Sequence, residues 1–80
     1  MPDRNPYEER AANLLKAEIK RKGLTYAQVV DRMAANGVAE NERNLRNKLS
    51  RGKFSAAYFL QVLEAVGVFE MRLEPRAVEQ

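Results

Sequence analysis

The sequence predicts an all-α fold, a compact four-helix orthogonal bundle. Four segments place apolar residues at the helical spacing of three and four, and each follows a residue type that caps helices well. A glycine closely follows each of the four segments, which is the common way for a helix to end. The linkers are only a few residues long, so consecutive helices must pack on one another. No repeat period runs through the 80 residues, which disfavours a solenoid of helical hairpins.

The first helix is expected to begin at Pro6, with Asn5 as its cap and Glu8 facing the positive end of the helix dipole. Gly23, followed by Leu24, predicts a left-handed stop after a basic last turn. The apolar stripe that should face the core consists of Tyr7, Ala11, Leu14, Leu15 and Ile19.

The second helix is expected to begin at Tyr26. Thr25 and Gln28 have the spacing of a capping box, in which each side chain binds the other residue's backbone N–H. Asn36 and Gly37 both tolerate positive φ, so this helix should stop near residue 35 and the chain should turn.

A third helix over residues 42–51, capped by Asn41, is the segment around which the function is expected to be built. Only Leu45 and Leu49 are apolar in it, so its inward face is narrow and the rest points to water or a partner. Gly52 should end it in a left-handed conformation.

The fourth helix is expected over residues 56–66, with Ser55 as its cap and Gly67 closing it. Phe54, in the link before it, is expected to plug the core. The predicted core positions of the helix itself are Phe59, Leu60, Leu63 and Val66.

Residues 68–75 change character, because apolar and charged residues alternate until Pro75 ends the run. A lone strand leaves its backbone groups unpaired, and the chain offers no second strand. Two alternatives follow: the run pairs as a short C-terminal β-strand with a second copy, giving a homodimer, or it packs on its own bundle. In the dimer, the interface residues would be Phe69, Met71 and Leu73.

This reading divides the chain into a disordered N-terminus over residues 1–5, the bundle over 6–67 and an arm over 68–80. The absence of Cys and His excludes disulfides, thiolate or imidazole metal sites and His-dependent acid–base chemistry. The composition leaves a purely carboxylate active site open, but Glu8 and Glu9, like Glu40 and Glu42, do not form a convincing acid–base pair. We therefore expect no enzyme, no metal and no cofactor. No apolar run approaches the roughly 20 residues that span a bilayer, and residues 1–10 are too polar for a signal peptide, so a cytoplasmic protein without membrane contact is expected.

The positive charge is concentrated in one segment. The net charge of the chain is +3, and residues 40–54 alone hold five basic against two acidic residues. Residues 55–80 are net acidic. Because the basic residues gather on one helix and the loop after it, the pattern favours a nucleic-acid partner more than the overall charge does.

The order of these parts resembles the lambda repressor-like helix-turn-helix domains of the Cro and XRE group over residues 14–68. The matching features are Leu24 and Thr25 at the entry to the second helix, Gln28, Gly37 and Val38 in the turn, Arg51 and Gly52 after the third helix, and LEAVGV at residues 63–68. The turn over residues 36–41 is longer than is usual in that group, and Ser50 stands where Glu is frequent. The same region also looks like a family of small bacterial proteins of unknown function, through the core NLRNKLSRGKFSAAYFLQ at residues 44–61.

The helix-turn-helix resemblance implies sequence-specific binding of double-stranded DNA by a small bacterial or phage-type transcriptional regulator, with residues 42–51 in the major groove. Arg binds guanine and Asn binds adenine in bidentate fashion, and both residue types lie away from Leu45 and Leu49. The expected base contacts are Arg43, Asn44, Arg46 and Asn47. The expected DNA-backbone contacts are Thr25, Gln28, Lys48, Arg51, Lys53 and Ser55.

An alternative is a protein-interaction module, such as an antitoxin or adaptor, whose basic face binds an acidic protein partner. An ordinary solvated helix face would also have this composition. Tyr7, Tyr26 and Tyr58 have the chemistry to stack on bases, but at helical spacing they are expected to be half-buried with the hydroxyl in water. Glu40 and Glu42 are expected to be local capping or surface charges.

Overall fold

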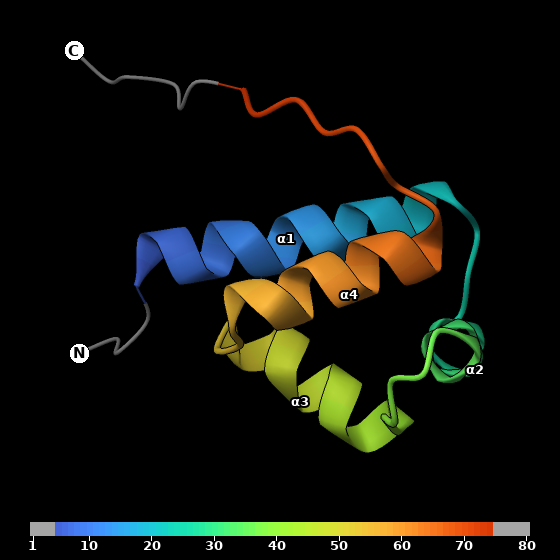
Figure 1. Ribbon diagram of the computed structural model, residues 1–80. Helices are drawn as coiled ribbons and strands as arrows, with labels where there is room; N and C mark the ends of the chain where they lie inside the picture. The colour runs from blue at the N-terminus through green and yellow to red at the C-terminus, as the bar shows by residue number, and fades with distance from the viewer. Residues whose placement is uncertain (1–4, 75–80) are drawn as a thin grey trace, which may run out of the picture.

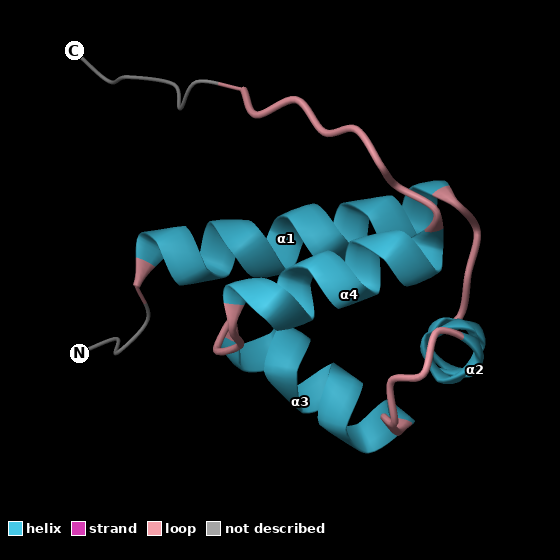
Figure 2. Ribbon diagram, viewed as in Figure 1, coloured by secondary structure: helices cyan, strands magenta, loops and turns pink. Residues whose placement is uncertain are grey.

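The computed structural model describes residues 5–74, which form four α-helices and no strand (Figures 1 and 2). The helices are α1 (Pro6–Arg21), α2 (Tyr26–Ala35), α3 (Glu42–Arg51) and α4 (Ala56–Val66). In Figure 1, α1 and α4 run across the view while α2 is seen along its axis, so α2 crosses them steeply. The predicted four-helix arrangement is confirmed for the described residues. Of residues 1–5, which were expected to be disordered, the structure describes only Asn5, which caps α1. Residues 1–4 and the expected end of the strand-like run at Pro75 lie outside the described range.

Side-chain caps start all four helices, as the sequence predicts. Asn5 accepts a hydrogen bond from the Tyr7 N–H at 2.7 Å. The capping box is complete, with 3.1 Å from the Gln28 N–H to the Thr25 hydroxyl and 2.8 Å from the Thr25 N–H to the Gln28 amide oxygen. Asn41 caps α3 by accepting from the Asn44 N–H at 2.8 Å, and Ser55 caps α4 by accepting from the Tyr58 N–H at 3.0 Å. These bonds satisfy amides that have no partner inside the helix.

Glycines in the left-handed region follow the ends of the helices. After α1, the Leu24 N–H reaches back to the Ile19 carbonyl over 3.1 Å, which completes the predicted Schellman stop. Gly52 ends α3 at φ 72°, and a Cβ at this position would lie 2.7 Å from the backbone oxygen of Glu8. Here the glycine also permits α3 to end directly against the first turns of α1.

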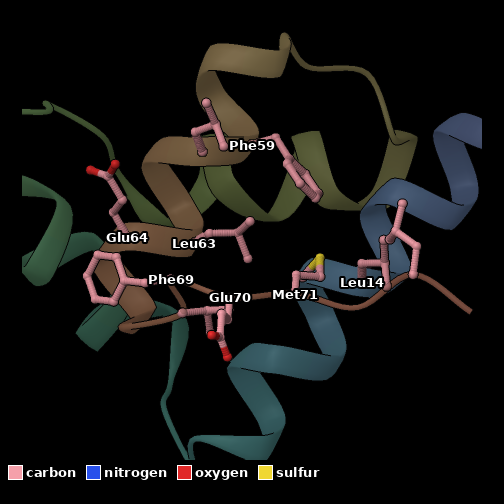
Figure 3. A pocket seen from close by; sticks show the side chains of 10 residues that line it. Leu14, Phe59, Leu63, Glu64, Phe69, Glu70 and Met71 are labelled. Atoms are coloured by element: carbon pink, nitrogen blue, oxygen red, sulfur yellow. The ribbon is translucent and has the colours of Figure 1, made fainter.

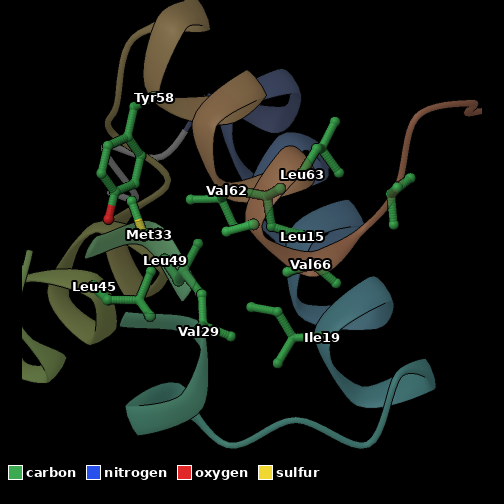
Figure 4. Close-up of a cluster of buried hydrophobic side chains, with 12 residues drawn as sticks. Leu15, Ile19, Val29, Met33, Leu45, Leu49, Tyr58, Val62, Leu63 and Val66 are labelled. Atoms are coloured by element: carbon green, nitrogen blue, oxygen red, sulfur yellow. The ribbon is translucent and has the colours of Figure 1, made fainter. Parts of the chain in front are cut away.

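The core lies among the four helices, where α1 and α2 each pack on both α3 and α4 (Figure 4). Its fully buried side chains are Leu15, Val29, Met33, Leu45, Leu49, Val62 and Val66. The predicted inward face of α3 is therefore confirmed. Phe54 is half-buried against the cluster, as expected.

Two predicted core positions are wrong. Leu60 is 57% exposed, because α4 contacts α1 and α2 through the arc that contains Tyr58, Val62 and Val66. Tyr7 is exposed as well, since the first turn of α1 extends past the end of α4 (Figure 1). Tyr58 is buried, although its hydroxyl was expected in water.

Of the arm expected over residues 68–80, the structure describes residues 68–74, and from here on the arm means these residues. They follow α4 as an extended segment that returns along the bundle (Figure 1). Val68 is buried and Met71 packs on the core, whereas Phe69 and Leu73 are 80% and 60% exposed. The Arg10 guanidinium donates to the carbonyl oxygen of Glu74. The β-strand is thus absent from the single chain, because no other described segment runs beside the arm to pair with it.

Candidate nucleic-acid interface

Helix α3 has one buried side and one exposed side. Leu45 and Leu49 are almost wholly buried where α3 packs on α1 and α2. Arg43, Asn47 and Arg51 are exposed on the side turned away from these leucines. The predicted orientation of the helix is confirmed.

One shallow hollow gathers half of the predicted DNA-binding residues. Its volume is about 270 Å³, and it is lined by Asn44, Asn47, Lys48, Arg51 and Lys53. The first four residues follow the spacing of three, four and seven that puts side chains on one helix face. Lys53 joins them from the turn after α3. The hollow therefore combines two amides with three cationic side chains.

The remaining predicted base contacts lie outside this hollow. The Arg46 guanidinium carbon stands 5.4 Å from the centre of the Tyr26 ring and a guanidinium nitrogen lies 3.9 Å from the Glu42 carboxylate. Arg46 therefore spans from α3 to the first turn of α2. Arg43 is exposed and does not line the hollow.

The predicted backbone contacts at the helix starts already hold hydrogen bonds within the protein. The side chains of Thr25 and Gln28 bind each other's backbone N–H groups, and the Ser55 hydroxyl accepts from the Tyr58 N–H. These residues order the ends of α2 and α4. The hydroxyl protons of Thr25 and Ser55 and the amide protons of Gln28 remain to donate to a ligand such as a phosphate oxygen.

Lys53 forms an ion pair with Glu8 of α1, with 2.7 Å between the ammonium nitrogen and a carboxylate oxygen. The hydrogen bond from Lys53 and its positive charge hold the pKa of Glu8 below its ordinary value. Because the ammonium group is more than half exposed, the pair is worth little in water. A phosphate oxygen could therefore replace the carboxylate at small cost.

Glu40, in the turn before α3, forms a cluster that the sequence analysis missed. Its side chain is only 3% exposed, and it accepts hydrogen bonds from the Tyr58 hydroxyl, the Lys48 ammonium and the Asn41 N–H. The Lys48 nitrogen also lies 4.2 Å from the centre of the Tyr58 ring. Glu40 is thus neither a surface charge nor only a local cap, because it fastens the start of α3 to α4.

Opposing effects set the pKa values in this cluster. Burial alone would raise the pKa of Glu40, but the hydrogen bonds from Tyr58, Asn41 and Lys48, with the charge of Lys48, bring the pKa below its ordinary value. Burial, followed by the hydrogen bond to Glu40 and its charge, raises the pKa of Tyr58. At neutral pH Glu40 is therefore a carboxylate and Tyr58 a neutral phenol. Glu40 therefore balances the charge of Lys48, a residue that also lines the hollow.

Comparison with known families places the chain. Residues 7–71 match the family described as a domain of unknown function, DUF6471. The chain belongs to this family. The match agrees with the resemblance to small bacterial proteins of unknown function. The DUF6471 region covers α2, α3, α4, all of α1 except Pro6, and residues 68–71 of the arm. No curated protein and no solved structure matches the chain.

Two further features of the described part of this DUF6471 protein bear on its chemistry. None of its helices has the length and apolar character needed to cross a membrane. Within residues 5–74, no three acidic side chains come together as a metal ion would require.

Proposed function

We propose that this DUF6471 domain binds double-stranded DNA in a sequence-specific manner as a small transcriptional regulator, with α3 in the major groove in the manner of lambda repressor-like domains. The observation that carries the proposal is the hollow in which Asn44, Asn47 and Arg51 lie beside two lysines. Amide and guanidinium groups are the side chains that recognise adenine and guanine edges, and lysines suit the flanking phosphates.

The shape of α3 supports this role. A helix of ten residues is about 15 Å long, and the major groove is about 12 Å wide and admits one helix. The exposed side of α3 carries no bulky apolar residue, whereas protein-binding helices commonly present apolar anchors. Composition and geometry therefore favour a polar, charged ligand.

The acidic residues near the hollow do not turn its surface negative. Glu40 is directed inward, where it neutralises part of the Lys48 charge without facing a ligand. Glu8 is bound to Lys53 at the edge. In this proposal Asn47 and Arg51 approach the bases while the lysines bind phosphates. Arg51, which the sequence analysis expected at the DNA backbone, is assigned to the bases here because it lines the hollow together with Asn44 and Asn47.

The first test is selection of bound duplexes from a random pool, followed by titration of the best sequence by fluorescence anisotropy at several salt concentrations. Asn47→Ala and Arg51→Ala should each weaken the preferred duplex by about 1–3 kcal/mol relative to a scrambled duplex. Lys16→Ala, an exposed position on α1, removes a charge without touching the hollow and should leave this preference unchanged.

The slope of log affinity against log salt should amount to several units, because phosphate contacts release counterions. The proposal fails if no duplex is enriched and scrambled DNA binds as well as any selected sequence. Stoichiometric capture of an acidic protein whose binding duplex DNA does not displace would instead identify α3 as a protein-interaction face.

A further inference from the structure

The arm presents apolar side chains that its own bundle does not cover. Phe69 and Leu73 are 80% and 60% exposed, and Leu60 beside them is also exposed. Together with Leu14 and Met71 they line a groove of about 440 Å³. In Figure 3, Met71 lies between Leu63 and Leu14, and the Phe69 ring stands at the end of the groove beside Glu64.

Between Val68 and Glu74, the backbone of the arm is also without partners among the described residues. Val68 donates to the Leu63 carbonyl, but no N–H of residues 69–74 donates to another described residue. Such a row of unpaired groups on an extended segment is a template for a second strand. The arm therefore combines an uncovered apolar row with an uncovered backbone edge.

The charges of the arm determine which strand fits. Glu70 and Arg72 alternate with the apolar residues, and directly opposed residues of an antiparallel pair share a face. If the two-fold axis passes through Met71, Glu70 of each copy faces Arg72 of the other. Phe69 then faces Leu73, and Met71 faces Met71.

Neighbouring registers lack this match. An axis at residue 70 opposes two glutamates, and an axis at residue 72 opposes two arginines. A slip by one residue sets charged against apolar side chains. An axis at Leu73 restores opposite charges but brings Pro75, which has no N–H, into the ladder.

We propose that two copies of this chain form a homodimer by antiparallel pairing of residues 69–73 about a two-fold axis at Met71. The partner's arm covers Phe69 and Leu73, and its carbonyl groups accept hydrogen bonds from the alternate N–H groups that point to the shared edge. This interface does not depend on DNA binding. Helix α3 lies on the opposite side of the bundle from the arm and remains exposed in the dimer (Figure 1).

Sedimentation equilibrium of the full chain with charge-reversal variants tests both the dimer and its register. Glu70→Arg opposes two arginine pairs and Arg72→Glu opposes two glutamate pairs, so each variant should weaken the dimer by at least about tenfold. The two variants mixed in equal amounts regain every opposite-charge pair and should form a heterodimer as strong as the native dimer. Lys16→Glu, away from the arm, should dimerise normally.

Circular dichroism should show the same helix content in all variants, because the substituted residues are exposed. The proposal is overturned if the native chain is monomeric at tens of micromolar, or if its dimer is insensitive to both reversals. Weakening by both single variants without recovery in the mixture would exclude the axis at Met71, because that axis requires recovery. Pairing centred on Leu73, by contrast, is not restored by mixing the two variants.

Discussion

Gly52→Ala should destabilise the domain more than any other exchange of a glycine for alanine among the described residues. Gly52 has φ 72°, where an L residue pays about 1–2 kcal/mol. Its new Cβ would lie 2.7 Å from the Glu8 oxygen and 2.9 Å from the Glu8 carbonyl carbon. Both are backbone atoms, so α1 or the end of α3 must shift, and overpacking of this kind costs about 1–3 kcal/mol more.

Gly37→Ala is the matched control. Gly37 has φ 83°, so it pays the same conformational penalty, but nothing lies within 4 Å of the position of its Cβ. The difference between the two variants therefore isolates the close approach of α3 to α1. The free energy of unfolding of a domain is about 5–15 kcal/mol, so the loss expected for Gly52→Ala is a large part of the total stability.

Urea unfolding followed by circular dichroism measures the stability of both variants. In thermal unfolding, the melting temperature should fall by about 4–8 °C for each kcal/mol of stability lost. Gly37→Ala should modestly lower the urea concentration at the midpoint of unfolding, and Gly52→Ala should lower it clearly further. The dependence of the unfolding free energy on urea concentration should be unchanged in both variants. Equal losses would refute the close contact with Glu8. No loss in either variant would refute the left-handed ends of α2 and α3.

Three other predictions concern the core, the buried carboxylate and the edge of the hollow. Leu49→Ala should cost about 2–5 kcal/mol in urea unfolding, whereas Leu60→Ala, which truncates an exposed leucine, should cost under about 0.5 kcal/mol. The pKa of Glu40 is lower in the folded state, so its contribution to the free energy of unfolding is complete above the ordinary carboxyl pKa and is lost as the pH falls through the folded value. Glu40→Gln should therefore reduce stability at neutral pH and weaken the dependence of stability on pH in the acid range. An unchanged pH dependence in the variant would contradict the assignment. Lys53→Ala should weaken all duplexes alike and reduce the salt slope by about one unit, and a loss confined to the selected sequence would instead make Lys53 a base contact.

Local signals predicted most of the fold. Thr25 and Gln28 form their box within three residues of each other, and Gly52 ends α3 where its sequence position indicates. Leu45 and Leu49 alone define an inward side, because no other residue of α3 is apolar. In each case the physics acts within one or two turns of the chain, so the amino-acid sequence contains it directly.

The errors arose where a residue depends on a distant partner. Tyr58 and Glu40 are 18 positions apart, and no periodicity relates them, so their hydrogen bond could not be read from spacing. Helix α4 is apolar around most of its circumference, and its pattern alone does not tell Leu60 from Val62. The contacts of α4 with both α1 and α2 make that choice, and they exist only in the folded bundle.

The positions of α3 and the arm link the two proposals quantitatively. Because they lie on opposite sides of the bundle, a dimer joined through its arms has two separate basic faces, and neither blocks the other (Figure 1). A duplex that engages both faces releases about twice as many counterions as one that engages a single face. Glu70→Arg places its added charge far from the hollow, yet by separating the copies it should reduce the salt slope towards half and leave the preferred half-site unchanged. The opposite result is an equal salt slope for the native chain and this variant, with the variant monomeric in sedimentation. In that case each DNA-bound unit is a single chain, and the arm forms an assembly that does not take part in DNA binding.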